Sequence, residues 1–255
     1  MSAKRRGPAS VLDGLRQAGC LKARFPRPVC DGWLDVATLN TSGGVAAGDR
    51  LDLSFAVGEG ARATIAPQAA ERFYRALPGA APSVVTNTVS VASGAAAEWL
   101  AQETILFDRC AVDRRLSVDV APDGWFLGCE TVVFGRAAMG ERVVSAFVRD
   151  RIEIRRGGAL LLHDAIRFDG AVDAMLQRPA IAAGARAVAT VVLVAQDAEA
   201  RLDAVRAAGD FAASAWNGML IARILGADGA AARRDVLAVL AVLRDGRPMP
   251  RVWLC

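Results

Sequence analysis

Apolar and polar residues alternate with a period of two along most of this chain, a pattern typical of β-strands with one buried face. Clean alternation covers four runs, at residues 51–57, 86–91, 116–120 and 151–155. Turn signals rich in glycine and proline separate such runs, at residues 58–60, 78–79, 93–94, 122–124 and 156–158. Many short strands at this spacing predict a mainly β protein with a layered, barrel or helical-sheet architecture.

The pattern changes in the carboxyl-terminal third. Residues 187–195 are almost continuously apolar, which predicts a fully buried strand. Residues 197–208 and 230–243 have apolar residues at helical spacing and end near glycine, so two helices are expected there. Residues 214–225, between the two predicted helices, are ambiguous, although an apolar run favours a strand.

The chain has 255 residues, which suits one large domain or two small ones. No linker, low-complexity segment or exact repeat divides it, so we expect a flexible segment over residues 1–20 and a single domain over residues 21–255. The mean hydropathy of +0.28 excludes a disordered chain. No continuously apolar run approaches the ~18–20 residues that span a bilayer, so no membrane association is expected.

Histidine and cysteine usage limits the metal chemistry open to this chain. The single histidine, His163, cannot form a multi-histidine site, and we expect it to bond Asp164 at a strand end. The five cysteines are widely spaced and include no Cys-x-x-Cys pair, which disfavours both a disulfide framework and a structural zinc site. The basic amino terminus has no apolar stretch behind it, unlike a secretory signal. We therefore expect a cytoplasmic protein with reduced thiols and no tight metal site.

The net charge is +4, and almost all of the positive charge comes from arginine. The arginines are scattered, in pairs at most, and do not form a basic stripe interleaved with aromatic residues. This arrangement disfavours nucleic-acid binding. Because arginine is the cation favoured at protein interfaces, a protein partner is expected instead.

A glycine-rich segment at residues 39–51 invites comparison with a phosphate-binding loop. Such a loop needs Lys-Ser/Thr after its last glycine and then a helix. Here Asp49 and Arg50 follow Gly48, and a strand comes next. The segment is therefore interpreted as a turn between strands, and nucleotide binding is rejected.

Residues 97–108 place three carboxylates, Glu98, Glu103 and Asp108, among apolar residues. Paired carboxylates can serve as general acid and base or as oxygen ligands for a metal. In a regular strand, however, Glu98 and Glu103 would point to opposite faces unless a bulge intervenes. Solvated or turn-capping carboxylates are the competing interpretation.

Two further segments are candidates for recognition. Residues 67–75 contain the only tyrosine, Tyr74, which either takes part in recognition or packs on the core. Residues 134–142 form a glycine-punctuated turn in which Glu141 is expected to pair with Arg136 or Arg142. From the residues alone, no catalytic constellation is recognisable.

Taken in order, six segments resemble the UreD family of urease accessory proteins, called UreH in some species. The matching segments are residues 39–51 (Leu-Asn-x-x-Gly-Gly-x-x-x-Gly-Asp-Arg-Leu), 68–75 (Gln-Ala-Ala-x-x-x-Tyr-Arg), 98–108 (Glu-Trp-Leu-x-Gln-Glu-Thr-Ile-x-Phe-Asp), 126–130 (Phe-Leu-Gly-x-Glu), 135–141 (Gly-Arg-x-x-x-Gly-Glu) and 250–253 (Pro-Arg-x-Trp). Arg72, Ala101 and Cys129 stand where the family commonly has lysine, proline and tryptophan. The resemblance runs from about residue 21 to the carboxyl end.

The resemblance implies a mainly β, helix-like sheet fold with about two helices in the carboxyl-terminal third. It also implies a non-enzymatic maturation factor that joins UreF and the GTPase UreG to apo-urease and supports nickel insertion, with GTP bound by UreG. Nickel(II) would pass only transiently, through an internal polar passage, and no cofactor would be tightly bound. A small β-rich hydrolase with paired carboxylates and a plain protein-interaction module are the alternatives.

The resemblance also selects candidate site residues. Carboxylates in the matched segments become candidates to line a nickel passage or its entrance: Asp49, Glu98, Glu103, Asp108 and Glu141. Other motif residues become candidates for structural or partner-binding roles: Gly43, Gly44, Gly48, Arg50, Gln68, Tyr74, Arg75, Gln102 and Arg136. No catalytic residue is expected.

Overall fold

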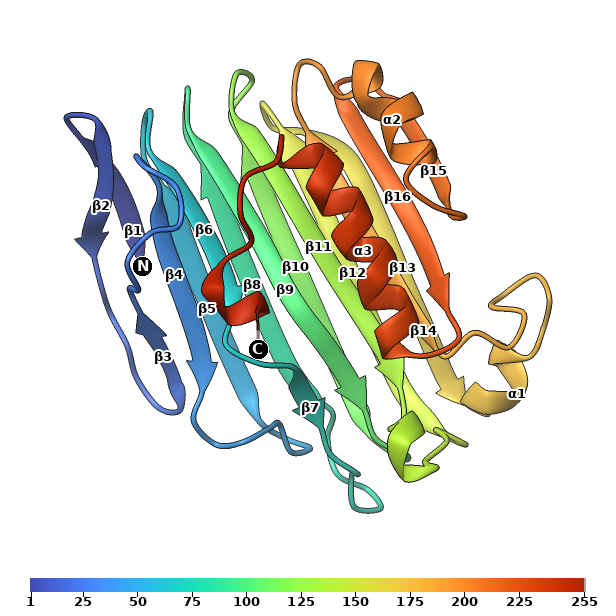
Figure 1. Ribbon diagram of the computed structural model, residues 1–255. Coiled ribbons are helices and arrows are strands. Elements are labelled where there is room, and N and C mark those ends of the chain that lie inside the picture. Colours follow the sequence, from blue (N-terminus) through green and yellow to red (C-terminus); the bar gives the residue numbers. More distant parts are fainter. Residues whose placement is uncertain (255) are drawn as a thin grey trace.

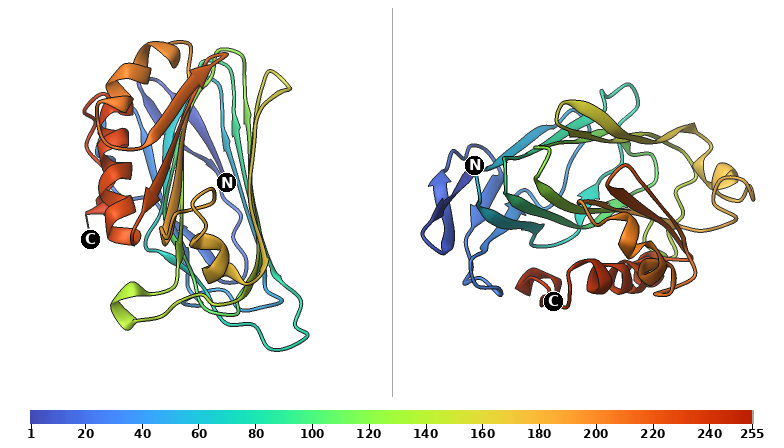
Figure 2. Two further views of the ribbon diagram at one scale, coloured as in Figure 1. Left: turned by 90° about the vertical axis from the view of Figure 1, so that its right-hand side faces the viewer. Right: turned by 90° about the horizontal axis from the view of Figure 1, so that it is seen from above.

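A computed structural model describes residues 1–254, and within them the strands form two sheets stacked face to face (Figures 1 and 2). The first sheet has the order β13-β12-β10-β8-β5-β1-β2, and the second has the order β15-β16-β14-β11-β9-β6-β4-β3, with β7 paired to β9. The strands of the first sheet are β1 (Ser2–Arg6), β2 (Ala9–Gly14), β5 (Arg50–Val57), β8 (Ser83–Val91), β10 (Ala111–Val120), β12 (Ala146–Arg156) and β13 (Ala159–Gly170). Those of the second are β3 (Leu21–Arg24), β4 (Leu34–Asn40), β6 (Arg62–Pro67), β7 (Glu71–Phe73), β9 (Ala96–Leu106), β11 (Trp125–Phe134), β14 (Ala187–Val194), β15 (Ala212–Trp216) and β16 (Met219–Gly226).

The central strands wind between the two sheets like a coil. From β4 to β12 the chain passes repeatedly from one sheet to the other, and β5, β8, β10 and β12 pair in parallel, as do β4, β6, β9 and β11. Antiparallel pairs such as β1–β2, β12–β13 and β15–β16 complete the edges. The expected mainly β, layered and helix-like fold is confirmed.

Residues 1–20 differ from the flexible segment that we expected. They contain the hairpin of β1 and β2, and β1 continues the first sheet by pairing with β5. The terminal amino group of Met1 donates a hydrogen bond to the Ser54 carbonyl oxygen at 2.8 Å, and Ala3 is buried. Sheet pairing and a few inward residues, which also include Met1 and Ser10, order the segment, although its charged residues mask the alternation.

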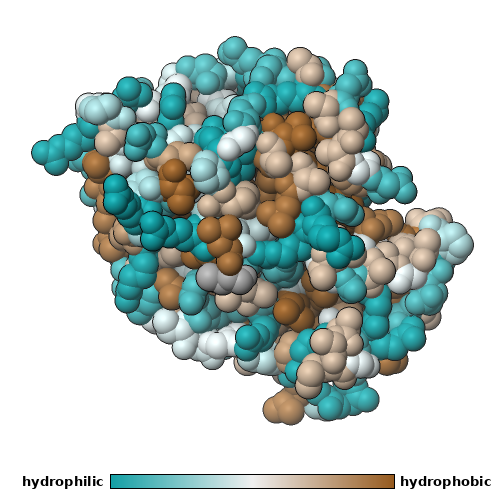
Figure 3. Space-filling view, viewed as in Figure 1, coloured by the Kyte–Doolittle hydropathy of each residue, from teal (hydrophilic) through white to brown (hydrophobic). Residues whose placement is uncertain are grey.

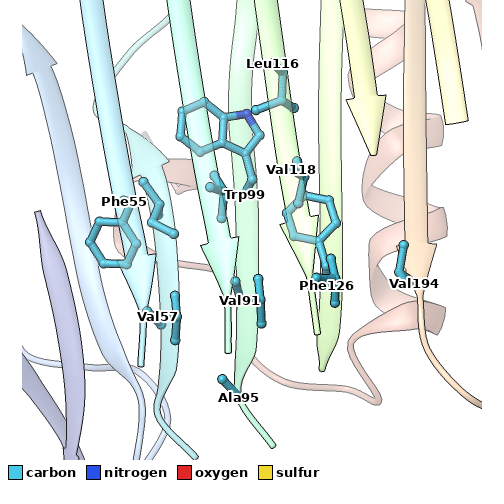
Figure 4. Close-up of a cluster of buried hydrophobic side chains, with 14 of the residues drawn as sticks. Phe55, Val57, Val91, Ala95, Trp99, Leu116, Val118, Phe126 and Val194 are labelled. Carbon is cyan, nitrogen blue, oxygen red and sulfur yellow. The ribbon is translucent and has the colours of Figure 1, made fainter. Parts of the chain in front are cut away.

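The main core lies between the sheets, where side chains from both inner faces interdigitate (Figure 4). Phe55, Trp99 and Phe126 are its large members. A second apolar layer lies on the outer face of the second sheet, beneath the helices, and includes Leu193 and Leu240. As predicted from its apolar run, β14 is buried throughout most of its length, because it contributes to both layers.

The longest helix, α3 (Gly229–Leu243), covers the outer face of the second sheet (Figures 1 and 2). Asp228 caps it by accepting a hydrogen bond from the Ala231 amide at 2.8 Å. The other predicted helix is shorter, α2 (Leu202–Arg206) after a 3-10 turn, and α1 (Val172–Leu176) was not expected. On this face hydrophobic and hydrophilic residues are interspersed (Figure 3). Among the described helices, none combines the length and the apolar character needed to cross a bilayer.

Candidate functional site

A cavity of about 190 Å³, with both apolar and polar lining residues, lies between the two sheets. Apolar side chains such as Leu53 and Trp99 form its walls. The polar residues lining it come from both sheets and from the loops at their ends: Thr38, Asn40, Gln68, Glu71, Arg72, Asn87, Gln102, Thr104, Arg114 and Glu130. A polar space inside an otherwise apolar core is costly unless its groups are hydrogen-bonded, so it marks a candidate functional site.

One end of the cavity is closed by a buried ionic network. Arg114 on β10 donates to both oxygens of Asp150 on β12, with Nε–Oδ1 at 2.9 Å and Nη2–Oδ2 at 2.6 Å. Its Nη1 donates to Glu130 Oε2 and to Thr104 Oγ1, both at 2.6 Å. Trp99 Nε1 donates to the other oxygen of Glu130 at 2.7 Å. Four strands therefore meet at one guanidinium, and burial raises the pKa of Glu130 although Arg114 opposes the shift.

A second, much smaller space of about 10 Å³ lies beyond this network. Asp150, Asp164, Thr190 and Glu130 are its polar lining residues. Its volume is near the minimum that holds one water molecule. Asp164 accepts a hydrogen bond from Arg223 of β16 at 2.6 Å, so the series of buried polar side chains continues toward β16.

At the other end of the cavity, Glu71 on β7 lies close to the glycine-rich segment. Asn40 Nδ2 donates to both oxygens of Glu71, at 3.2 and 3.1 Å, and to the Gly44 carbonyl oxygen. Burial raises the pKa of Glu71. The Tyr74 hydroxyl donates to the Gly43 carbonyl oxygen at 2.6 Å, which holds the glycine turn against β7.

A bulge in β9 decides which way the carboxylates of this strand point. Leu100 pairs with Cys129 and Glu103 with Thr131, so two residues of β9 oppose the single residue Glu130 of β11. Glu98 and Glu103 therefore both face the helix side of the second sheet, although their spacing predicts opposite faces in a regular strand. They do not line the cavity between the sheets.

Arginines hold both of these carboxylates in place. Glu98 is fully buried and accepts hydrogen bonds from Arg244, Arg247 and Thr64. Glu103 forms an ion pair with Arg233 of α3 at 3.0 Å. The two groups attach the carboxyl-terminal part of the chain to β9, which is a structural role for both.

Gln102, the bulged residue, connects the cavity wall to the carboxyl-terminal segment. Its side-chain amide donates to the carbonyl oxygens of Pro67, Gln68 and Val252 at 3.1, 3.0 and 2.8 Å. Trp253 Nε1 donates to the Leu100 carbonyl oxygen at 3.1 Å on the same side of the strand. The segment after α3 is thus fixed to β9 at several points.

The remaining acidic motif residues gather at the loop end of the sheets. Asp108 Oδ1 accepts from the amides of Val144 and Ser145, at 2.8 and 3.1 Å. Glu141 accepts from Arg136 Nε at 2.6 Å, so the expected pairing with Arg136 is present. The Arg136 guanidinium lies 4.1 Å from the centre of the Phe107 ring.

A family model described as "UreD urease accessory protein" matches residues 1–254. The chain belongs to the UreD family. It is 44% identical over 245 residues to "Urease accessory protein UreD 3" of Bradyrhizobium sp. (strain BTAi1 / ATCC BAA-1182), covering 94% of this chain and 86% of that protein. It is 43% identical to "Urease accessory protein UreD" of Azorhizobium caulinodans, covering 97% and 91%, and to that of Roseobacter denitrificans, covering 99% and 92%. The resemblance inferred from six segments is confirmed.

In this UreD-family chain, none of the five candidate carboxylates lines the 190 Å³ cavity. Asp49 accepts from the Ala46 amide at 2.9 Å in the turn before β5, and it lines a wide groove that includes part of β3 and β5. Glu98 and Glu103 lie under the helix layer, and Asp108 and Glu141 lie at the loop end. Their roles in a nickel passage stay predictions.

The other motif residues divide between the cavity and the surrounding turns. Gly43, Gln68 and Gln102 line the cavity, while Gly44 contacts Tyr74. Gly48 takes a positive φ of 85° before the exposed Arg50. Arg75 forms an isolated antiparallel bridge with Cys110. Tyr74 packs edge-on against Phe107, with ring centres 5.2 Å apart, so it joins the glycine turn to the loop end.

The sequence interpretation missed the carboxylates that do line the cavity and its neighbour: Glu71, Glu130, Asp150 and Asp164. Glu130 closes one of the matched segments, and Asp150 alternates with inward Val148 and Ile152. That alternation places Asp150 on the core face, which is a signal that was available in the sequence. His163 and Asp164 are neighbours within β13, so they point to opposite faces, and the expected bond between them is wrong. Asp164 instead accepts hydrogen bonds from Arg223 and Thr190.

Free thiols and possible metal ligands were also located. Cys20, Cys30, Cys110 and Cys129 are free thiols, and Cys255 lies outside the described residues. Over residues 1–254, no three or more histidine, cysteine, aspartate or glutamate side chains are placed together to hold a metal ion.

Proposed function

We propose that this UreD-family chain is a non-enzymatic subunit that joins UreF and UreG to apo-urease, and that nickel(II) crosses it through the cavity between the sheets. The observation that carries this proposal is the carboxylate of Glu130, only 5% exposed, at the inner end of a polar cavity in the core. Nickel(II) is the cargo here, bound transiently, and GTP would be bound by UreG.

The lining of the cavity suits the movement of a cation better than its storage. Amide, hydroxyl and carboxylate groups make up most of the polar lining, at Asn40, Asn87, Thr104, Glu71 and Glu130, together with the guanidinium groups of Arg72 and Arg114. Nickel(II) binds imidazole and thiolate more firmly than such oxygen groups. A conducting path needs sites that bind the cation strongly enough for it to enter and weakly enough for it to leave. The cavity is also large enough for a cation that keeps some of its water.

Exposed apolar side chains at the loop end support a protein partner there. Leu77, Met139 and Val144 are 78%, 72% and 61% exposed, on loops that meet next to Asp108 and Arg136. Apolar residues with a polar rim are typical of interaction sites. We assign this end to contacts within the urease activation complex. The four free thiols suit a cytoplasmic location.

The test combines partner binding with metal transfer. Glu130→Gln removes the negative charge from the cavity and keeps the size of the side chain. Glu59→Gln makes the same change at an exposed loop position and serves as the matched control. We expect both variants to co-purify with UreF and UreG, and only Glu130→Gln to lower the nickel content and activity of co-expressed urease. A folded, partner-bound Glu130→Gln variant that supports full metallation would contradict the passage.

Two other functions give different results in the same experiment. A plain interaction module would bind the same partners, but urease metallation would survive polar substitutions inside the cavity. A hydrolase would need free carboxylates facing one pocket. Glu98 and Glu103 do share a face, but Arg244, Arg247 and Arg233 hold them in ion pairs, which argues against acid–base chemistry there.

A further inference from the structure

The carboxylate of Glu130 separates the two internal spaces. Glu130 is the one described residue that lines both the 190 Å³ cavity and the 10 Å³ space beyond it. Arg114 lies beside it and lines only the larger cavity. A cation that moves from one space to the other therefore passes the Arg114 guanidinium at close range, where repulsion between positive charges is strong because water is excluded.

The charges in this network do not balance. One guanidinium faces two carboxylates, those of Glu130 and Asp150, and all three side chains are less than a tenth exposed. Arg114 stands directly opposite Asp150 in the register of β10 and β12, so the backbone itself sets this pair. The second carboxylate comes from the opposite sheet. Arg114 thus occupies the position between two carboxylates where a divalent cation would otherwise be held.

Arg114 holds the two carboxylates unequally. Nε and Nη2 of Arg114 both donate hydrogen bonds to Asp150, whereas only Nη1 donates a hydrogen bond to Glu130. Bidentate arginine–carboxylate pairs are the stronger and more directional ones. Glu130 also keeps its bond from Trp99 on the other oxygen. The guanidinium can therefore release Glu130 and remain paired with Asp150.

We propose that Arg114 is a gate on the cation path: it closes the path by occupying the Glu130 carboxylate, and it withdraws onto Asp150 when a divalent cation takes its place at Glu130. The gate rests on the proposed function, since it acts on the same passage. Without Arg114 the two carboxylates would trap a divalent cation. The guanidinium therefore keeps the path from becoming a storage site.

The first test uses the full-length chain and nickel(II) alone. Arg114→Gln should retain nickel(II) in equilibrium dialysis and gain thermal stability on adding it, because a ligand that binds only the folded state stabilises it. The wild-type chain and the matched variant Arg114→Gln/Asp150→Asn should do neither. The gate would be overturned if Arg114→Gln bound no more nickel(II) than the wild type. It would also be overturned if Arg114→Gln bound no more nickel(II) than the double variant.

The second test follows nickel transfer and does not depend on the folding of Arg114→Gln. Asp150→Asn leaves Arg114 and Glu130 as a balanced pair, so the fold should be retained, but the guanidinium loses the charge onto which it withdraws. Nickel-dependent activation of apo-urease should then slow relative to the wild type and to Asp119→Asn, which alters an exposed aspartate of β10.

The outcomes separate the gate from the passage. If Glu130→Gln blocks transfer and Asp150→Asn leaves its rate unchanged, the passage stands and the gate is wrong. If neither variant affects transfer, the proposed function itself fails.

Discussion

Arg244 and Glu98 lie 146 residues apart in the sequence and form a fully buried ion pair, with Nε–Oε1 at 2.9 Å and Nη2–Oε2 at 3.0 Å. The pair joins the end of α3 to the beginning of β9. Arg247 adds a third contact to Glu98 at 2.9 Å, and its guanidinium lies 4.7 Å from the centre of the Trp33 ring. The helix layer is therefore attached to the second sheet by charge as well as by apolar packing.

Removing Glu98 should destabilise the fold strongly. Glu98→Ala leaves Arg244 buried without its counter-ion, which typically costs about 3–5 kcal/mol. Urea unfolding followed by circular dichroism measures this loss, and Glu59→Ala, at an exposed loop position, serves as the control. The double variant Glu98→Leu/Arg244→Met should be more stable than Glu98→Ala, because neither charge remains. A single variant as stable as the control would show that the pair contributes little.

Gly44 should not tolerate a side chain. Its φ is 153°, and an added Cβ would overlap the ring of Tyr74. Gly44→Ala should lower the free energy of unfolding by about 1–3 kcal/mol. In a double-mutant cycle with Tyr74→Ala, part of that loss should disappear, because the overlapping ring is gone. Strictly additive effects would mean that backbone strain alone explains the cost.

Asp35 should make stability depend on pH in an unusual direction. Burial raises the pKa of Asp35 above its ordinary 3.8, and within residues 1–254 its Oδ1 has no hydrogen-bond partner. The folded state then binds the proton more tightly than the unfolded state, so this contribution favours folding at low pH and is lost as the pH rises through the raised pKa. Asp35→Asn should therefore gain stability relative to the wild type as the pH rises toward neutral.

Asp123 provides a control of opposite sign. A hydrogen bond from the Ser93 hydroxyl lowers the pKa of the exposed Asp123. The contribution of Asp123 to the stability of the fold is therefore present above its ordinary pKa of 3.8. It is lost as the pH falls through the lowered pKa of the folded state. Urea titrations at several pH values should therefore give opposite slopes for Asp35→Asn and Asp123→Asn. Slopes of the same sign would contradict the assignment for Asp35.

Gln102→Glu should release the carboxyl-terminal segment. The substitution replaces an amide donor with a carboxylate facing three carbonyl oxygens, one of them from Val252. Limited proteolysis should cleave after Arg247 or Arg251 faster than in the wild type. Gln68→Glu is the matched control, since its exposed side chain lies outside this contact. Unchanged cleavage would show that the other contacts suffice to hold the segment.

The sequence predicted local structure well where one interaction dominates. Period-two runs became strands, and the apolar run at residues 187–195 became the buried β14, because burial alone sets these patterns. The helix at Gly229–Leu243 was foreseen from its spacing and its glycine stop. The hairpin of β1 and β2 was not, since it is ordered by pairing with β5 and not by its own composition.

The candidate site needed information that alternation does not contain. Alternation with Val112 and Leu116 points Arg114 inward, but its contact with Glu130 depends on how the two sheets face each other. The β9 bulge is a second example: one extra residue brings Glu103 to the same side as Glu98. Register and sheet stacking are tertiary properties, so the cavity emerged only from the structure.

The helix layer also has a consequence for synthesis. The strands that α3 covers, β11, β14 and β16, all leave the ribosome before it, so their outer apolar face stays exposed to water until residues 229–243 follow. During that interval Glu98 also lacks Arg244. A nascent chain in this condition is prone to sticking to its neighbours. Ribosome-bound chains stalled before residue 229 should therefore recruit holdase chaperones far more than chains stalled after the helix has emerged.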